Sequence, residues 1–226
     1  RLAQSSRFED NAPLAPGSEA YRLARVRARV LTTTNTTQLG QWFQERLAAG
    51  DGPGESALRY GYALTLRRAG RYEEAAAQLE SLLRREPDRL AFRIEQAELA
   101  LARGEAERAW SLFERILTLY PDNYVATVHY SQALAAQGDP RRAMRLLDPY
   151  RQRRSRDPLL FQLYARAAQR AGERPAMYGA LAEFHYLNGE LEQAIEQAER
   201  GLAQGGSPYE KAQLQARLRD YRAARR

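Results

Sequence analysis

Cysteine is absent from the 226 residues of this chain, which excludes disulfide bonds and thiolate metal sites. Histidine is scarce: His129 and His185 lie far apart, and neither has a second ligand three or four residues away on the same helix face. Helical metal pairs need that spacing, because only residues one turn apart can share an ion. We therefore expect this chain to bind no metal and no cofactor.

Lysine is nearly absent as well, because Lys211 is the only lysine among the 35 basic residues. Against 28 acidic residues they leave a formal net charge of +7, a mild excess that is spread along the chain and is typical of a solvated surface. No stretch approaches the roughly 18 consecutive apolar residues of a transmembrane helix. We therefore expect no membrane-spanning segment.

The sequence also lacks the common catalytic motifs. It contains no phosphate-binding loop, no dinucleotide fingerprint, no G-x-S-x-G elbow and no H-E-x-x-H zinc helix. Carboxylate pairs such as Glu73 and Glu74 stand on predicted solvent-facing helix surfaces. The sequence therefore predicts that this chain is not an enzyme.

What the sequence does contain is a glycine that returns every 34 residues, at Gly70, Gly104, Gly138 and Gly172. An alanine follows the first three glycines five residues later, at Ala75, Ala109 and Ala143, whereas the fourth place holds Met177. Glycine ends a helix because it adopts left-handed angles without steric cost. A small residue one turn into the next helix lets two helices cross closely. A 34-residue unit of two helices is typical of the tetratricopeptide repeat.

The predicted fold class is all-α, an α-α superhelix (a tetratricopeptide-like solenoid) of about 12 antiparallel helices. We expect helices near 18–31, 38–49, 55–69, 72–85, 89–103, 106–119, 123–137, 140–153, 157–171, 175–188, 191–203 and 208–224. Residues 1–17 are interpreted as a linker from an absent upstream domain, and 18–226 as the solenoid. Within it, 18–50 is a degenerate leading pair and 56–172 holds the regular repeats. The end, 173–226, is shifted by half a repeat, because the next Gly-Ala pair, Gly189 and Ala194, comes 17 residues after Gly172.

A solenoid of this kind offers a concave groove lined by the first helix of each pair. Superposing the repeats on their glycines predicts groove-facing residues at Tyr60, Leu64, Arg67 and Arg68, at Ile94, Glu98 and Leu101, at Val128, Gln132 and Ala135, and at Gln162, Arg166, Gln169 and Arg170. Arginine can grip a carboxylate with two parallel hydrogen bonds, and Tyr60 could anchor an apolar side chain. The pattern favours an extended or helical polypeptide as the ligand.

The whole chain also resembles one family. Three segments carry the resemblance: SEAYRLARVRARVL (Ser18–Leu31), SALRYGYALTLRRAGRYEEAA (Ser56–Ala76) and AEFHYLNGELEQAIEQAERGL (Ala182–Leu202). They are similar to the C-terminal half of periplasmic zinc metalloproteases of the β-barrel assembly-enhancing type. The third segment is the most specific of them, because it carries the half-repeat shift.

The resemblance implies a role in recruitment. The parent would be a zinc metalloendopeptidase whose catalytic domain lies upstream, and the zinc would belong to that domain, since its ligands have no counterpart here. The helical domain would bind the β-barrel assembly machinery or unassembled outer-membrane proteins, and shield or present them to the protease. The location implied is the periplasm of a Gram-negative bacterium.

Two other interpretations remain open. One is a stand-alone tetratricopeptide scaffold or cell-envelope assembly factor. The other is a basic solenoid that binds RNA or an anionic surface, suggested by the net charge of +7. Single-stranded RNA binding uses aromatic rings interleaved with cations, and the arginines here are not arranged in that way. We therefore expect a polypeptide partner and no nucleic acid.

Overall fold

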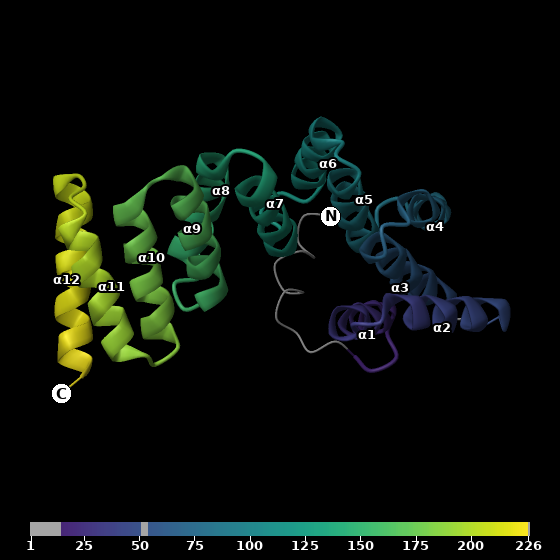
Figure 1. Ribbon diagram of the computed structural model, residues 1–226, viewed down its shortest axis with the longest axis horizontal. Helices are drawn as coiled ribbons and strands as arrows, with labels where there is room; N and C mark the ends of the chain where they lie inside the picture. Colours follow the sequence, from purple (N-terminus) through teal and green to yellow (C-terminus); the bar gives the residue numbers. More distant parts are fainter. Residues whose placement is uncertain (1–14, 51–53, 226) are drawn as a thin grey trace, which may run out of the picture. The chain divides into compact units, whose positions relative to one another are not determined.

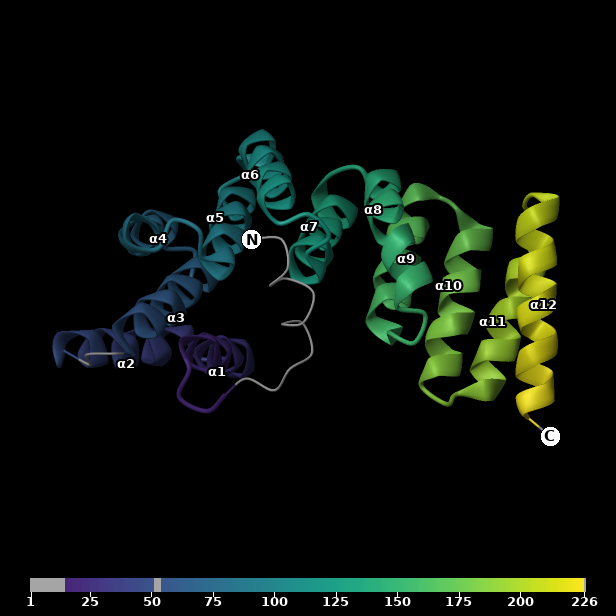
Figure 2. The same ribbon diagram turned by 180° about the vertical axis from the view of Figure 1, so that it is seen from behind.

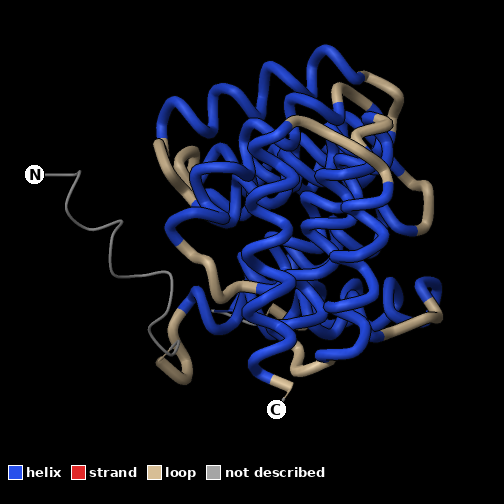
Figure 3. Tube along the Cα trace, turned by 90° about the vertical axis from the view of Figure 1, so that its left-hand side faces the viewer, coloured by secondary structure: helices blue, strands red, loops and turns tan. Residues whose placement is uncertain are grey.

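The structure is a computed structural model that describes residues 15–50 and 54–225. Within these residues the chain forms twelve α-helices and no strand (Figures 1 and 3). The helices are α1 (Glu19–Thr32), α2 (Thr36–Ala48), α3 (Glu55–Arg68), α4 (Tyr72–Arg85), α5 (Leu90–Ala102), α6 (Ala106–Leu119), α7 (Tyr124–Gln137), α8 (Pro140–Arg153), α9 (Pro158–Ala171), α10 (Arg174–Leu187), α11 (Leu191–Ala203) and α12 (Pro208–Ala224). The predicted all-α fold is confirmed. Most of the predicted linker, residues 1–14, lies outside the described residues.

The chain divides into two compact units, residues 1–126 and 127–226, a division that the repeat pattern does not predict. In the first unit, α1 and α2 pack on α3, and the α3–α4 and α5–α6 hairpins follow. In the second unit, α8 to α12 pack in chain order, and α10 also contacts α12. Figure 2 shows α9 to α12 side by side. None of the helices in the described part of the chain is long and apolar enough to cross a membrane.

The repeated glycines lie at the corners between paired helices. Gly70, Gly104 and Gly172 have φ angles of 74°, 77° and 76°, and Gly189 has 79°. After each, the next amide donates back across the corner, as Arg71 N does to the Leu66 carbonyl at 2.9 Å, which is the hydrogen bond of a glycine-ended helix.

Gly138 lies at the same kind of corner but does not have the expected left-handed angles. Its amide donates to the Leu134 carbonyl instead. The neighbouring Asp139 is extended (φ −93°, ψ 102°) because Pro140 follows it, and this residue turns the chain.

The alanines after these corners are fully buried at Ala75, Ala109, Ala143 and Ala194. Each lies in the first turn or two of the second helix of a pair, and its burial agrees with a small side chain between packed helices. Met177, at the equivalent place in the fourth repeat, is only half-buried.

Candidate functional site

In the first unit, four of the predicted groove residues lie inside the helix packing. Tyr60 is 2% exposed, its ring stacks at a tilt on Phe92, and its hydroxyl accepts a 3.1 Å hydrogen bond from Arg27 Nη1. Leu64 and Ile94 are buried as well, as is Leu101. A ligand reaches these residues only by displacing a helix.

Arg67 and Glu98, also predicted to face a ligand, are paired with each other. Arg67 Nη2 donates to Glu98 Oε2 at 2.7 Å, and its Nε donates to the carboxylate of Glu95. Glu95 is fully buried. Burial raises the pKa of Glu95 to about 7, although the adjacent Arg67 acts in the opposite direction. The charges on the predicted groove positions of this unit are therefore satisfied internally.

Arg68 and Arg170 occupy equivalent positions three repeats apart, and both bind the C-terminal end of an earlier helix. Arg68 Nη1 donates to the carbonyls of Val30 and Thr33, at the end of α1. Arg170 Nη2 donates at 3.0 Å to the carbonyl of Ala136, in the last turn of α7. Free carbonyls at a helix C-terminus attract cations. The structure thus gives both arginines a helix-capping contact in place of a predicted ligand contact.

In the second unit, three of the predicted residues come together. Gln162, Arg166 and Gln169 line a cavity of about 430 Å³, which we call the α9–α11 cavity. Its other lining residues are Ala165 from α9, Met177, Tyr178, Leu181 and Phe184 from α10, and Gln197 and Arg200 from α11. On α7, Gln132 is exposed, whereas Val128 and Ala135 are buried and so do not face a groove as predicted.

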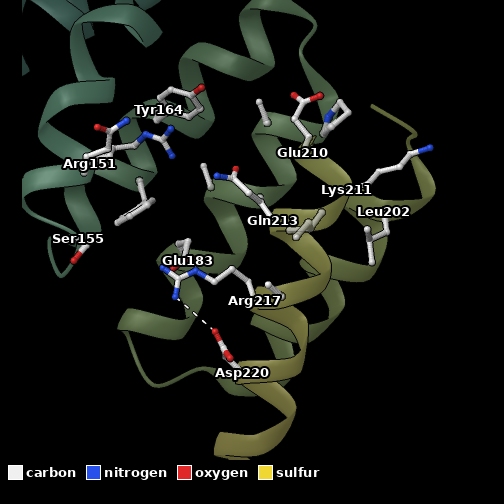
Figure 4. Close-up of a pocket in the computed structure, with 18 of the residues that line it drawn as sticks. Arg151, Ser155, Tyr164, Glu183, Leu202, Glu210, Lys211, Gln213, Arg217 and Asp220 are labelled. Atoms are coloured by element: carbon white, nitrogen blue, oxygen red, sulfur yellow. Dashed lines mark ion pairs between the residues drawn. The ribbon is translucent and has the colours of Figure 1, made fainter. Parts of the chain in front are cut away.

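A larger cavity, of about 620 Å³, lies in the second unit (Figure 4). It is bounded by the end of α8, by the first two turns of α9, and by the helices α10 and α12. We call it the α8–α12 cavity. Its lining residues are Arg151, Gln152, Ser155, Phe161, Tyr164, Pro175, Ala176, Gly179, Ala180, Glu183, Leu202, Gly205, Glu210, Lys211, Gln213, Leu214, Ala216, Arg217 and Asp220. The sequence interpretation named none of them as binding residues.

Arginine side chains enter the α8–α12 cavity from two sides. The Arg151 guanidinium lies 3.6 Å from the centre of the Tyr164 ring and pairs with Asp148 at 2.7 Å. Its Nε is buried, and no acceptor among the described residues satisfies it. From α12, Arg217 pairs with Glu183 at 2.5 Å and lies 3.9 Å from Asp220 (Figure 4).

The half-repeat shift explains why these residues face a cavity. Aligning the corner at Gly189 with the corner at Gly104 places Gly179 and Glu183 at the positions of Ile94 and Glu98. One 34-residue period further on stand Gln213 and Arg217. All four line the α8–α12 cavity, and α10 packs on α12 as α3 packs on α5. The cavity is therefore the groove of the shifted register.

The two cavities use opposite faces of α10. Residues spaced three or four apart share a helix face. Pro175, Gly179 and Glu183 line the α8–α12 cavity, whereas Leu181 and Phe184 line the α9–α11 cavity. The shift of the repeat thus gives the second unit a hollow surface on each side of α10.

The carboxylates of the α8–α12 cavity are engaged in structural contacts. Glu183 and Asp220 face Arg217, and Glu210 accepts from the amide of Ser207 at 2.8 Å in a capping box. No group of three His, Cys, Asp or Glu side chains that could hold a metal ion occurs in the residues that the structure describes. The chemistry that this arrangement offers is recognition by hydrogen bonds and apolar contact.

Comparison with solved structures finds chains of similar fold. A tetratricopeptide repeat protein from Parabacteroides merdae aligns with a TM-score of 0.53 at 13% identity, over 92% of this chain and 86% of that one. MamA from Desulfovibrio magneticus RS-1 aligns with 0.52 at 16% identity, over 75% of this chain and 96% of that one. Yeast Tom70 aligns with 0.55 at 12% identity, over 92% of this chain and 47% of that one.

A search of curated protein sequences finds no match. Two family profiles, both described as tetratricopeptide repeat, match residues 60–124 and 100–167. The matched residues coincide with the 34-residue glycine period. Residues 60–167 are therefore tetratricopeptide repeats, within a chain that has the all-α fold of a tetratricopeptide-like solenoid.

Proposed function

We propose that this chain is a non-catalytic protein-binding module that holds a segment of another polypeptide in the α8–α12 cavity. Tetratricopeptide solenoids bind partners along the surface lined by the first helix of each pair. One observation carries the proposal. Ile94 and Glu95 fill their positions in the first unit, whereas the equivalent Gly179 and Ala180 leave an open cavity in the second.

The lining of the cavity suits a polypeptide backbone. Gln213 supplies both a hydrogen-bond donor and an acceptor. Phe161 and Leu214 contribute apolar surface. A volume of about 620 Å³ falls within the range of about 300–1,000 Å³ typical of ligand pockets.

We further propose that the parent protein is a periplasmic zinc metalloprotease of the β-barrel assembly-enhancing type, in which this domain recruits or shields outer-membrane β-barrel proteins or their assembly machinery. The similarity of the three quoted segments supports this assignment. The third segment, Ala182–Leu202, carries Gly189, the corner that sets the shifted register. Any zinc would belong to the upstream catalytic domain.

Filling the cavity tests the binding site. A Cβ on Gly179 would lie 3.8 Å from Leu214 Cδ1, an ordinary contact, so Gly179→Leu adds its bulk without strain at the backbone. The probe is an outer-membrane β-barrel protein diluted from urea onto the immobilised chain. We expect wild type and Gly179→Ala to capture it and Gly179→Leu to lose capture by roughly tenfold. Equal capture by all three contradicts the proposed site.

The division of roles has its own test. The purified chain should not cleave an unfolded barrel protein, with or without added zinc, whereas cleavage that a chelator abolishes would show that this chain is itself a protease. The residues encoded before Arg1 should include H-E-x-x-H. Their absence would instead favour a stand-alone tetratricopeptide scaffold in cell-envelope assembly.

A further inference from the structure

We infer that the α9–α11 cavity is a second polypeptide site, which takes a segment whose apolar side chain is flanked by carboxylates. The inference rests on the proposed protein-binding role of the chain but not on the α8–α12 cavity, because the two cavities share no lining residue. It makes the second unit a binder with two different faces, one on each side of α10.

The floor of the α9–α11 cavity is apolar and adaptable. Met177, Tyr178, Leu181 and Phe184 line it from α10, and each is only half-buried. Met177 occupies the place where three other repeats have a fully buried alanine. The fourth repeat thus departs from its own pattern by placing a flexible thioether on an open surface. Methionine is common on surfaces that adapt to different ligands.

The rim of this cavity carries positive charge and no negative charge. Its polar lining residues are Arg166, Arg200, Gln162, Gln169 and Gln197, and no carboxylate lines it. Arg200 pairs with Glu196 at 2.5 Å. Arg166 is exposed, and none of the described residues forms a hydrogen bond or ion pair with it.

The positive charge of Arg166 has no counterpart in the three preceding repeats. The equivalent positions of the three preceding repeats hold Leu64, Glu98 and Gln132. An arginine that folding leaves without a partner can form two charge-assisted hydrogen bonds to a carboxylate at little further cost. The complement of the cavity is therefore an anionic group beside an apolar side chain.

A polypeptide meets these requirements better than a nucleic acid does. Single-stranded nucleic acid is held by several phosphate contacts together with rings presented for stacking. Here one free arginine stands beside a floor where Tyr178 and Phe184 alternate with aliphatic side chains. An acidic segment with a leucine or phenylalanine places one carboxylate and one apolar group at the required positions.

Fluorescence anisotropy with synthetic peptides tests the inference. The probe is a labelled peptide of about ten residues in which Leu and Phe alternate with Asp and Glu. One control peptide has Asn and Gln in place of the acids, and another has Ser in place of Leu and Phe. The protein variants are Arg166→Glu, Gly179→Leu and Arg115→Glu. The last is a matched control, since Arg115 is exposed on α6 and has no partner among the described residues.

We expect the acidic apolar peptide to bind wild type, and both control peptides to bind at least roughly tenfold more weakly. Arg166→Glu should weaken binding of the acidic peptide by roughly tenfold or more. Arg115→Glu and Gly179→Leu should leave the affinity within about twofold. Circular dichroism should show unchanged helicity in Arg166→Glu, because the replaced side chain is exposed.

Three results would overturn the inference: unchanged affinity in Arg166→Glu, equal binding of the Asn and Gln peptide, or binding of an oligouridylate probe that depends on Arg166. The outcome separates from that of the proposed function. Loss of barrel-protein capture in Gly179→Leu together with no acidic-peptide binding leaves the proposed function standing and removes only the second site. Unchanged barrel-protein capture in Gly179→Leu together with acidic-peptide binding that depends on Arg166 removes the α8–α12 site and keeps the second one.

Discussion

Glu95 shows how a single residue closes the groove of the first unit. Its carboxylate is fully buried between α3 and α5, where Arg67 and Arg27 lower its pKa, and burial and Glu98 raise it. Burial is the largest effect, so its pKa rises to about 7. In the folded chain Glu95 therefore holds a proton at pH values where the unfolded chain has released it.

This shift predicts a pH dependence of stability. Because the folded-state pKa is raised from 4.5 to about 7, the free energy of unfolding should fall as pH rises through that window, by at most about 3 kcal/mol. Glu95→Gln cannot titrate, so its stability relative to wild type should increase over the same range. Urea unfolding of both proteins between pH 4.5 and 8 measures the difference. A difference that does not vary with pH would contradict the raised pKa.

A repeat period predicts which residues are equivalent, but it does not predict what these residues contact. The period placed Arg68 and Arg170 at equivalent positions, which the structure confirms, because both contact an earlier helix end. What the period could not tell was the identity of their partner. A carbonyl at the end of α1 or α7 satisfies a guanidinium as a ligand carboxylate would, and only the three-dimensional arrangement distinguishes them.

At the scale of elements, the close helix crossings depend on the buried alanines. Ala75→Leu should overpack the α3–α4 crossing and destabilise the chain by roughly 1–3 kcal/mol. Ala77 on the same helix is exposed, so Ala77→Leu is the matched control and should change stability by less than about 0.5 kcal/mol. Urea unfolding measures both. Equal effects of the two substitutions would mean that Ala75 does not set the spacing of the helices.

Helix α12 depends on its first turn. Ser207 accepts a hydrogen bond from the Glu210 amide at 3.2 Å, and the Glu210 carboxylate accepts from the Ser207 amide at 2.8 Å. Ser207→Ala should cost about 1 kcal/mol and weaken barrel-protein capture, because Gln213 and Arg217 are positioned by this helix. Ser207→Thr keeps the capping oxygen and should resemble wild type. Thermal unfolding and capture measure both variants. If Ser207→Ala behaves like wild type in both, the capping box does not stabilise α12.

The order of the helices could be predicted because glycine, proline and alanine act locally. The site could be predicted only in part. Extending the register of the regular repeats identified Gln162, Arg166 and Gln169, which line the α9–α11 cavity. It does not reach Gly179 and Gln213, because these positions face the groove only when the register is moved by the half repeat at Gly189. Cavity formation itself depends on the small Gly179 and Ala180, and groove positions are usually sought among large or charged residues.

On the scale of the whole chain, the count of 35 basic residues overstates the free positive charge, because many arginines pair with carboxylates of other helices. Arg222 with Glu199 at 2.7 Å and Arg225 with Glu192 at 3.0 Å join α12 to α11. Such exposed pairs add little stability, but they reduce the charge available to a polyanion. Both proposed sites should therefore depend on salt far less than nucleic-acid binding does.

The salt dependence should differ between the two cavities. Raising NaCl from about 0.1 M to about 0.5 M should weaken the acidic peptide severalfold, because it pairs with the exposed Arg166. Capture that depends on Gly179 should change little, because it relies on buried contact with Phe161 and Leu214. Anisotropy and capture measured at both salt concentrations test this. A steep loss of both would instead favour a general electrostatic surface.

The two cavities should bind their ligands independently of each other. The cavities share no lining residue, so the effects of Gly179→Leu and Arg166→Glu should add within about 0.5 kcal/mol in the double variant. Saturating wild type with the barrel-protein segment should likewise leave the affinity for the acidic peptide unchanged. Both cavities nevertheless use α10, which has Gly179 on one face and Leu181 on the other. If one ligand changes the affinity for the other, the coupling must be reciprocal, and α10 is the element through which it would act.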